Sequence, residues 1–184
     1  DFYPRWKFAV DNYFLNECDK TVIAFSDTKH KDFEQDNTIF AQVPPCVWPQ
    51  ATLYRYKFVK ALLDTGIIDD VDYLFYIDAD LYALENITLD EVTSLDKPLT
   101  GVHHPGNFTN PGWETFERRP ASTAAVGDLP TKLGKKAIYH QGCFWGGKLE
   151  SVRKMVTTLD NRITEDESNG IHAIWYDESQ MNKY

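Results

Sequence analysis

The chain has 184 residues, of which 42% are hydrophobic and 14% aromatic, and this composition favours a globular protein over a disordered one. Its formal net charge of −9 argues against nucleic acid as a partner, because phosphate contacts need clustered lysine and arginine. Three widely spaced cysteines match neither a disulfide framework nor a zinc motif, and they favour a reducing compartment. No apolar run approaches the roughly 20 residues of a membrane span.

Apolar periodicity predicts helices and strands that alternate along the chain. Helices are expected at residues 6–15, 51–63 and 148–166, and another is expected to begin near residue 177. Strands are expected at residues 20–27, 38–44, 73–77 and 137–147, with a loop-rich stretch from about 98 to 130. This alternation favours an α/β fold with a mainly parallel central sheet, formed as one domain over residues 1–184.

Two aspartates, Asp78 and Asp80, directly follow the apolar strand expected at 73–77. Carboxylates two positions apart at a strand end can point to the same side, where they repel each other. A divalent cation between them would remove the repulsion, and the carboxyl end of a strand is where ligands bind in open α/β sheets. The alternative is a solvated loop in which both aspartates cap turns.

A second pair of acids, Asp177 and Glu178, follows the apolar residues Ile174 and Trp175. Asp177 and Gln180 have the spacing of a capping box at a helix N-terminus, and the spacing alone favours this structural interpretation. The functional alternative is that the helix start presents Glu178 in a fixed direction as a nucleophile, base or electrostatic stabiliser.

Histidines and glycines give weaker signals. The motif HHPG at 103–106 is typical of a turn, although His104 could instead hydrogen-bond a hydroxylated substrate. Most tryptophans are expected in the core, but an aromatic face in a cleft would suit a sugar ring. Gly146-Gly147 is expected to end a strand, because neither the dinucleotide-binding nor the Walker pattern is present.

Several motifs in a fixed order resemble glycosyltransferase family 6, which contains the histo-blood-group A and B transferases and the α-1,3-galactosyltransferases, with bacterial and phage relatives. The motifs are VDYLFYIDADLY (71–82), HHPG (103–106), FERRP (116–120), YHQGCFWGG (139–147) and IHAIWYDESQMNKY (171–184). The last three, in this order and at this spacing, are far more specific than Asp-x-Asp. The resemblance covers residues from about Tyr13 to Tyr184.

The resemblance implies a GT-A-type nucleotide-sugar-binding fold and a hexosyltransferase activity. The reaction would be the retaining transfer of galactose or N-acetylgalactosamine from a UDP-sugar to the 3-hydroxyl of a β-galactoside acceptor. Asp78 and Asp80 match the family's metal-binding DXD motif, which holds Mn²⁺ against the diphosphate. Because both acids are present, dependence on Mn²⁺ is expected.

The resemblance also implies roles for the second pair of acids. Glu178 falls on the family's catalytic glutamate, on the face of the sugar opposite UDP. Asp177 falls on the neighbouring acid, which holds hydroxyls of the donor sugar. The sequence leaves open whether Glu178 forms a covalent glycosyl intermediate or only stabilises an oxocarbenium-like state.

The remaining implied site residues concern the two substrates. On the donor side they are Arg55, Thr52, Ala79, Gln141 and Cys143. On the acceptor side they are His104 and Trp175. Gln141 and Cys143 match the pair that helps to sort galactose from N-acetylgalactosamine, and the size of Cys143 leans toward galactose, although Gln141 departs from the family pattern.

By comparison with the family, the chain is expected to be incomplete at both ends, without the uracil-binding strand and the basic C-terminal segment. Two other hypotheses are a non-catalytic carbohydrate- or UDP-sugar-binding protein on the same fold and a metal-dependent hydrolase. Glu178 argues against the first, and the shortage of further His and Asp ligands argues against the second. A cytoplasmic location of bacterial or phage type is expected, with the Golgi lumen as the alternative for an animal-like enzyme.

Overall fold

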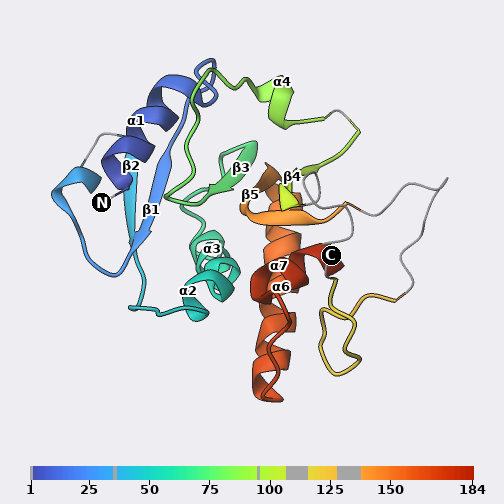
Figure 1. Ribbon diagram of the computed structural model, residues 1–184. Helices are drawn as coiled ribbons and strands as arrows, with labels where there is room; N and C mark the ends of the chain where they lie inside the picture. The colour runs from blue at the N-terminus through green and yellow to red at the C-terminus, as the bar shows by residue number, and fades with distance from the viewer. Residues whose placement is uncertain (1, 35–36, 95, 107–115, 128–137) are drawn as a thin grey trace.

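The computed structural model describes residues 2–34, 37–94, 96–106, 116–127 and 138–184 (Figure 1). Its helices are α1 (Tyr3–Tyr13), α2 (Gln50–Leu53), α3 (Arg55–Leu63), α4 (Leu89–Val92), α6 (Leu149–Ser168) and α7 (Tyr176–Lys183), with a 3-10 helix, η1 (Lys31–Phe33). Its strands are β1 (Val22–Ser26), β2 (Thr38–Gln42), β3 (Tyr73–Ile77), β4 (Leu99–His103) and β5 (His140–Lys148).

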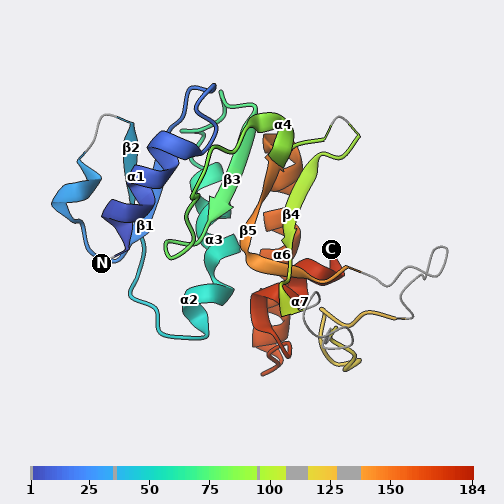
Figure 2. The same cartoon turned by 45° about the horizontal axis from the view of Figure 1, so that its top comes forward.

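The strands form two separate sheets (Figure 2). β1 and β2 make a parallel pair, and α1 lies beside it in both views. The other sheet has the strand order β3-β5-β4 and is antiparallel, with Ile77 at the end of β3 opposite Phe144 on β5. A bulge between Gly101 and Val102 shifts the register of β4 against β5.

The mixed α/β class is confirmed, but a mainly parallel central sheet is not. In the part of the chain that the structure describes, parallel strand pairing joins only β1 and β2. β3 and β4 run in the same direction, and β5, which comes later in the chain, pairs antiparallel with both. The alternation of strands and helices does not reveal that a later strand pairs between two earlier ones. In addition, β4 falls in the stretch that was expected to be loop.

The main core lies between the antiparallel sheet and helices α3 and α6. α6 contributes one apolar stripe with the spacing of a helix face, and its buried apolar members are Leu149, Val152, Met155, Val156, Leu159 and Ile163. On β5, Trp145 is 1% exposed and stacks on Tyr76 of β3, with ring centroids 4.9 Å apart, and it packs at a tilt against Tyr56 of α3, with centroids 5.3 Å apart. This aromatic layer fixes the ends of β3 and α3 from which the polar residues of the site project.

The helix expected at 51–63 is divided at Tyr54 into α2 and α3. Tyr54 leaves the helical region, with a ψ of 3°, and Arg55 then begins a new helix. The break allows the Arg55 Nε to donate a hydrogen bond to the Thr52 carbonyl at 2.9 Å.

Among the described helices, none is both long enough and apolar enough to cross a membrane.

Candidate active site

Arg55 is the centre of a charged cluster at the end of β3. Its side chain is only 6% exposed, and its nitrogens lie 3.3 Å from Asp78 Oδ1 and 3.4 Å from Asp177 Oδ2. The guanidinium also donates to the carbonyls of Thr52 and Gly142. One buried cation therefore joins α3, the end of β3, the middle of β5 and the start of α7.

Asp78 follows β3 directly and uses one of its oxygens for protein contacts. Oδ1 accepts the Tyr76 hydroxyl at 2.8 Å in addition to the Arg55 ion pair, and Tyr76 also presents its ring to the guanidinium at 4.9 Å. The Asp78 N–H donates to the Cys143 carbonyl at 2.9 Å, which ties the residue to β5. Burial raises the pKa of Asp78, against the lowering effects of Arg55 and the Tyr76 hydrogen bond. Both side-chain contacts involve Oδ1, so they hold the carboxylate in place without using Oδ2.

Ala79 and Asp80 lie in the exposed turn that follows, closed by a hydrogen bond from the Leu81 N–H to the Asp78 carbonyl at 3.0 Å. The negative charge of Asp80 contributes to the raised pKa of Asp78, after burial, so the two carboxylates lie close enough to repel each other. A cation that binds both would relieve this repulsion.

The donor set at this turn fits a hard divalent cation. The cluster holds the carboxylates of Asp78, Asp80, Asp177 and Glu178 against the single guanidinium of Arg55, so its charge is strongly negative. Mn²⁺ and Mg²⁺ accept carboxylate oxygens, and two protein ligands leave positions for water or phosphate oxygens. Among the described residues no group of three or more His, Cys, Asp or Glu side chains is placed for a metal, and this candidate site rests on the two carboxylates of Asp78 and Asp80.

The first turn of α7 supplies the second pair of acids. Asp177 is 6% exposed, and burial raises its pKa to about 6, although Arg55 acts to lower it. The Thr52 hydroxyl lies within reach of this carboxylate and also lowers its pKa. Glu178 is half-buried, and its Oε1 accepts the Gly142 N–H at 3.0 Å. Burial raises the pKa of Glu178, while the Gly142 hydrogen bond and Arg55 lower it and so support the ionised form.

The capping box expected from Asp177 and Gln180 is wrong. α7 begins at Tyr176, one residue before the expected start. The side chain of its N-cap residue, Trp175, makes no capping hydrogen bond. The Ser179 hydroxyl instead accepts the Trp175 N–H at 3.0 Å, and Gln180 turns to a different carboxylate. Asp177 is free of a capping role because it is directed at the guanidinium, so the helix start presents both acids to the cluster.

Gly142, on β5, leaves no space for a side chain inside the cluster. A Cβ at this position would lie 2.7 Å from Asp177 Oδ2, 3.2 Å from Glu178 Cγ and 3.3 Å from an Arg55 nitrogen. Both of its backbone polar groups are used, the N–H by Glu178 and the carbonyl by Arg55. The sequence motifs pointed to its neighbours, Gln141 and Cys143, and not to Gly142 itself. A glycine inside a strand is nevertheless a signal of close backbone approach.

Gly142→Ala is expected to lower the melting temperature by about 2 to 12 °C, because overpacking costs about 1–3 kcal/mol and each kcal/mol corresponds to about 2–4 °C at this size. Thermal unfolding followed by circular dichroism measures the shift. Gly127→Ala is the matched control, since a Cβ there meets nothing within 4 Å. Equal melting temperatures for the two variants would contradict the tight contact at Gly142.

The two residues that flank Gly142 border the cluster. Gln141 is half-buried and lies opposite Val102 of β4, next to the bulge. Cys143 is also half-buried, and burial followed by the charge of Asp78 raises the pKa of its thiol to about 11. Cys143 is therefore a neutral side chain at neutral pH, close to the first aspartate of the turn.

The two residues expected on the acceptor side lie at the end of β4 and at the N-terminus of α7. His104 follows β4, donates its N–H to the Tyr139 carbonyl at 2.8 Å and has its ring 6.1 Å from that of Tyr139. Burial and then the charge of Glu178 raise the pKa of Tyr139, so this tyrosine connects His104 with the acids. Trp175 is 40% exposed at the N-terminus of α7.

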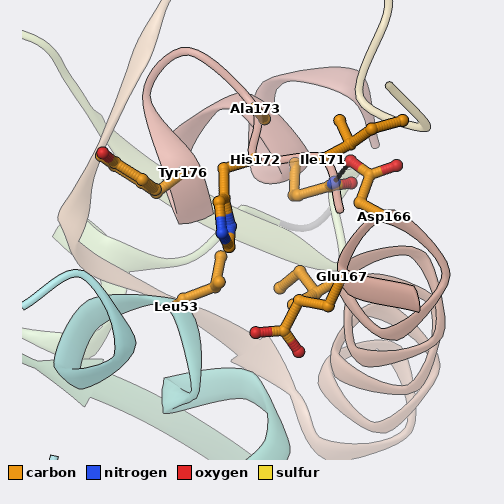
Figure 3. A pocket seen from close by; sticks show the side chains of 9 residues that line it. Leu53, Asp166, Glu167, Ile171, His172, Ala173 and Tyr176 are labelled. Carbon is orange, nitrogen blue, oxygen red and sulfur yellow. Dashed lines mark hydrogen bonds between the residues drawn. The ribbon is translucent and has the colours of Figure 1, made fainter. Parts of the chain in front are cut away.

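A small cavity near the start of α7 is distinct from the charged cluster (Figure 3). Its volume is about 10 Å³, room for about one water molecule. Leu53, His172 and Tyr176 are among its lining residues, and neither Asp177 nor Glu178 is. The cavity is too small for a sugar, and it is not part of the candidate site.

Comparisons with known proteins point to one family. The chain matches the model of Glycosyltransferase family 6 over residues 35–184. It is 30% identical over 138 residues to histo-blood group ABO system transferase 2 of Rattus norvegicus, an alignment that covers 74% of this chain and 39% of the rat protein. It is 28% identical to the O-antigen biosynthesis glycosyltransferase WbnI of Escherichia coli, over 100% of this chain and 75% of that protein.

A third relative is globoside alpha-1,3-N-acetylgalactosaminyltransferase 1 of Gallus gallus, 28% identical over 74% of this chain and 38% of the chicken protein. The alignments with the rat and chicken proteins thus span about two fifths of those proteins' length. The family match includes every member of the charged cluster, from Arg55 to Glu178. The chain belongs to glycosyltransferase family 6.

Proposed function

We propose that residues 1–184 belong to the catalytic domain of a retaining hexosyltransferase of the GT-A type, which moves galactose or N-acetylgalactosamine from a UDP-sugar to the 3-hydroxyl of a β-galactoside. The observation that carries this proposal is the convergence of Asp78, Asp177 and Glu178 around Arg55. Family membership supports sugar transfer, and the names of relatives include both an α-1,3-N-acetylgalactosaminyltransferase and an α-1,3-galactosyltransferase.

In this proposal Asp78 and Asp80 hold Mn²⁺, which when bound supplies a Lewis acid for the departing UDP. Arg55 and Tyr76 occupy Asp78 Oδ1, and this arrangement favours a single, fixed direction for the other oxygen. Ala79 places only a methyl group between the two acids, in the exposed turn. The phosphates would complete the coordination, which fits the small number of protein ligands.

The reaction breaks the bond between the anomeric carbon and the UDP oxygen, and the electron pair leaves with UDP. The acceptor oxygen forms the new bond, and its proton passes to a phosphate oxygen of the departing nucleotide. Glu178 stabilises the positive charge that develops at the anomeric carbon, either through space or by a transient covalent bond. The Gly142 N–H orients its carboxylate and, together with Arg55, favours the ionised form against the effect of burial, and Asp177 accepts hydrogen bonds from donor-sugar hydroxyls.

Sugar selection is assigned to the β5 edge of the cluster. The half-buried side chains of Gln141 and Cys143 flank Gly142, and Thr52 lies next to Asp177 across the cluster. Cys143 lies close to Asp78, and its side chain, larger than that of glycine, would leave less room for an acetamido group, which favours galactose as the donor sugar. His104 and Trp175 then form part of the acceptor side. The cytoplasmic location expected from the sequence stays a prediction.

Tyr76→Phe is expected to weaken Mn²⁺ binding by about 10- to 100-fold, the usual effect of removing an outer-shell partner of a metal ligand. The variant loses the hydroxyl that orients Asp78 but keeps the ring that stacks on Trp145. Titration calorimetry with Mn²⁺ in the presence of UDP measures the affinity.

Tyr54→Phe is the matched control, because it also removes a hydroxyl bonded to a carboxylate, that of Glu167 at 2.9 Å, outside the cluster. Its Mn²⁺ affinity should equal that of the wild type. If Tyr76→Phe also bound Mn²⁺ as tightly as the wild type, the orienting role of Tyr76 would be wrong.

The function is tested by incubating the full chain with several UDP-sugars and Mn²⁺ and by measuring UDP release with and without lactose. The expected result is lactose-dependent release, fastest with UDP-galactose, and a trisaccharide product of matching mass. Release that does not depend on lactose would indicate a hydrolase. Binding of UDP with no release under any condition would indicate a sugar-nucleotide-binding protein.

A further inference from the structure

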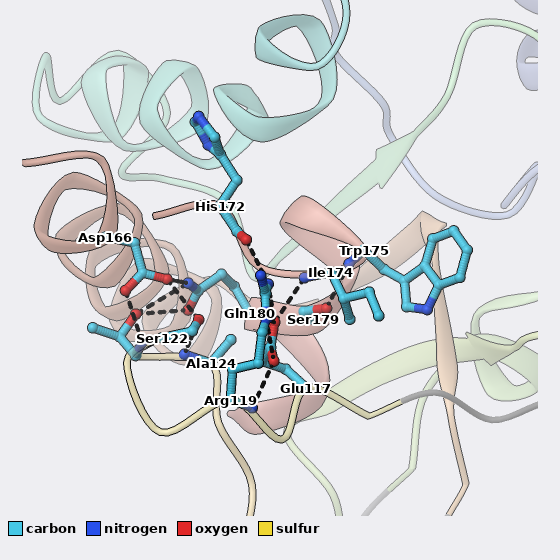
Figure 4. A network of polar contacts seen from close by, with 11 residues as sticks. Glu117, Arg119, Ser122, Ala124, Asp166, His172, Ile174, Trp175, Ser179 and Gln180 are labelled. Carbon is cyan, nitrogen blue, oxygen red and sulfur yellow. Dashed lines mark hydrogen bonds and ion pairs between the residues drawn. The ribbon is translucent and has the colours of Figure 1, made fainter. Parts of the chain in front are cut away.

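The FERRP segment carries an ion pair that the proposed reaction does not use (Figure 4). Glu117 is 2% exposed and accepts hydrogen bonds from Arg119 Nε at 3.0 Å and Nη2 at 2.6 Å. The same carboxylate accepts the Ile174 N–H at 2.7 Å, and Arg119 Nη2 also donates to the His172 carbonyl at 2.6 Å. The pair therefore binds one backbone donor and one backbone acceptor of the short segment between α6 and α7.

This segment has a backbone that needs external support. Tyr176, the first residue of α7, has a φ of +46°, in the left-handed region that non-glycine residues rarely adopt. Such a conformation persists where surrounding contacts impose it. The contacts here are the Glu117–Arg119 pair before the turn and the Ser179 hydroxyl after it, which accepts the Trp175 N–H. In Figure 4 the ring of Trp175 points away from this network.

A second group of buried polar side chains holds α7 from the same chain segment. Gln180 is 1% exposed and donates to Asp166 Oδ2 of α6 at 2.9 Å. Asp166 also accepts the Ser122 hydroxyl at 2.8 Å and the Thr123 N–H at 2.7 Å. The segment 116–127 thus ties α6 to α7, while the acids of α7 reach toward Arg55 and Gly142 instead.

We propose that Glu117 and Arg119 are positioning residues for Glu178: they fix the turn before α7 and thereby place the Glu178 carboxylate on the Gly142 N–H. This inference rests on the proposed function and assigns to FERRP a part in the rate of transfer. The donor diphosphate, in contrast, is assigned to Asp78, Asp80 and Mn²⁺, which the pair does not touch. Loss of the pair should therefore lower kcat and leave the Mn²⁺-dependent affinity for UDP almost unchanged.

Glu117→Gln is expected to lower kcat by up to about 100-fold, since a displacement of about 1 Å of a catalytic group can cost that much. The affinity for UDP in the presence of Mn²⁺ should stay near its wild-type value. Asp69→Asn is the matched control, because Arg153 pairs with Asp69 at 2.7 Å and with the Leu63 carbonyl at 3.0 Å in a similar arrangement outside the cluster. If Glu117→Gln fails to fold, Arg119→Lys, at a side chain 56% exposed, removes the two-pronged contact and keeps the charge.

A double-mutant cycle with Glu178→Gln separates positioning from general destabilisation. If Glu117 acts through Glu178, adding Glu117→Gln to Glu178→Gln should lower kcat little further. A loss in the double variant equal to the product of the two single losses would overturn the proposal.

Hydrogen exchange gives a measurement that does not depend on turnover. In Glu117→Gln and Arg119→Lys, the amides of Gly142 and of residues 172–179 should exchange faster than in the wild type and in Asp69→Asn. If the wild type transfers no sugar with any donor, the proposed function fails, and these exchange rates still decide the positioning role. Unchanged exchange at Gly142 in both variants would overturn it.

Discussion

Glu178→Gln is expected to lower sugar transfer by about 100- to 1,000-fold while UDP binding persists, because it removes the charge that stabilises the transition state. Glutamine keeps the size of the side chain and an oxygen that can accept the Gly142 N–H at the 3.0 Å seen for Glu178. The loss should therefore appear in kcat and not in donor affinity. Initial rates at saturating UDP-sugar and calorimetric titration with UDP measure the two quantities.

The matched control for this substitution is Glu150→Gln. Glu150 is also an acid in the first turn of a helix, α6, but its side chain is 84% exposed and lies outside the charged cluster. Its removal should leave transfer unchanged. If Glu178→Gln turned over as fast as Glu150→Gln, Glu178 would have no part in the chemical step.

Asp80→Asn is expected to abolish Mn²⁺-dependent binding of UDP. Asp80 lies in the exposed turn after β3, where its charge adds to that of Asp78 and makes the turn attractive to a cation. Loss of a direct ligand should cost more than the about 10- to 100-fold expected for an outer-shell partner. UDP affinity is measured by calorimetry with Mn²⁺ and again after chelation.

Asp70→Asn serves as the control, because Asp70 is an exposed aspartate that precedes the same strand. It should bind UDP as the wild type does, and chelation should weaken that binding. Equal UDP affinity in wild type and Asp80→Asn, or in wild type with and without chelator, would count against a metal site at this turn.

Strands and helices with strong local patterns were predicted well. The run of aromatic and branched residues at 73–77 coincides with β3, and the apolar stripe predicted at 148–166 corresponds to α6. β4 was missed because its short, polar sequence, which includes Gly101, has no strand pattern and depends on pairing with β5. The position of β5 between two earlier strands is a tertiary property that local periodicity does not contain.

The candidate site was predictable in its charged members and less so in its supporting ones. Asp78, Asp177 and Arg55 were named from motifs, and the structure brings them together. Tyr76 was counted only as part of an apolar strand, because nothing local shows that its hydroxyl returns to Asp78. The capping-box error has the same origin, since the Asp-x-x-Gln spacing does not reveal the partners that each side chain has in the folded chain.

The guanidinium of Arg55 has counter-charges from distant parts of the chain: Asp78 follows soon after it, and Asp177 comes only with α7. On the ribosome, α3 and β3 emerge well before β5 and α7, so a nascent chain carries this cation without its second acid and without the Gly142 carbonyl. The full set of Arg55 contacts can therefore form only after α7 has been synthesised.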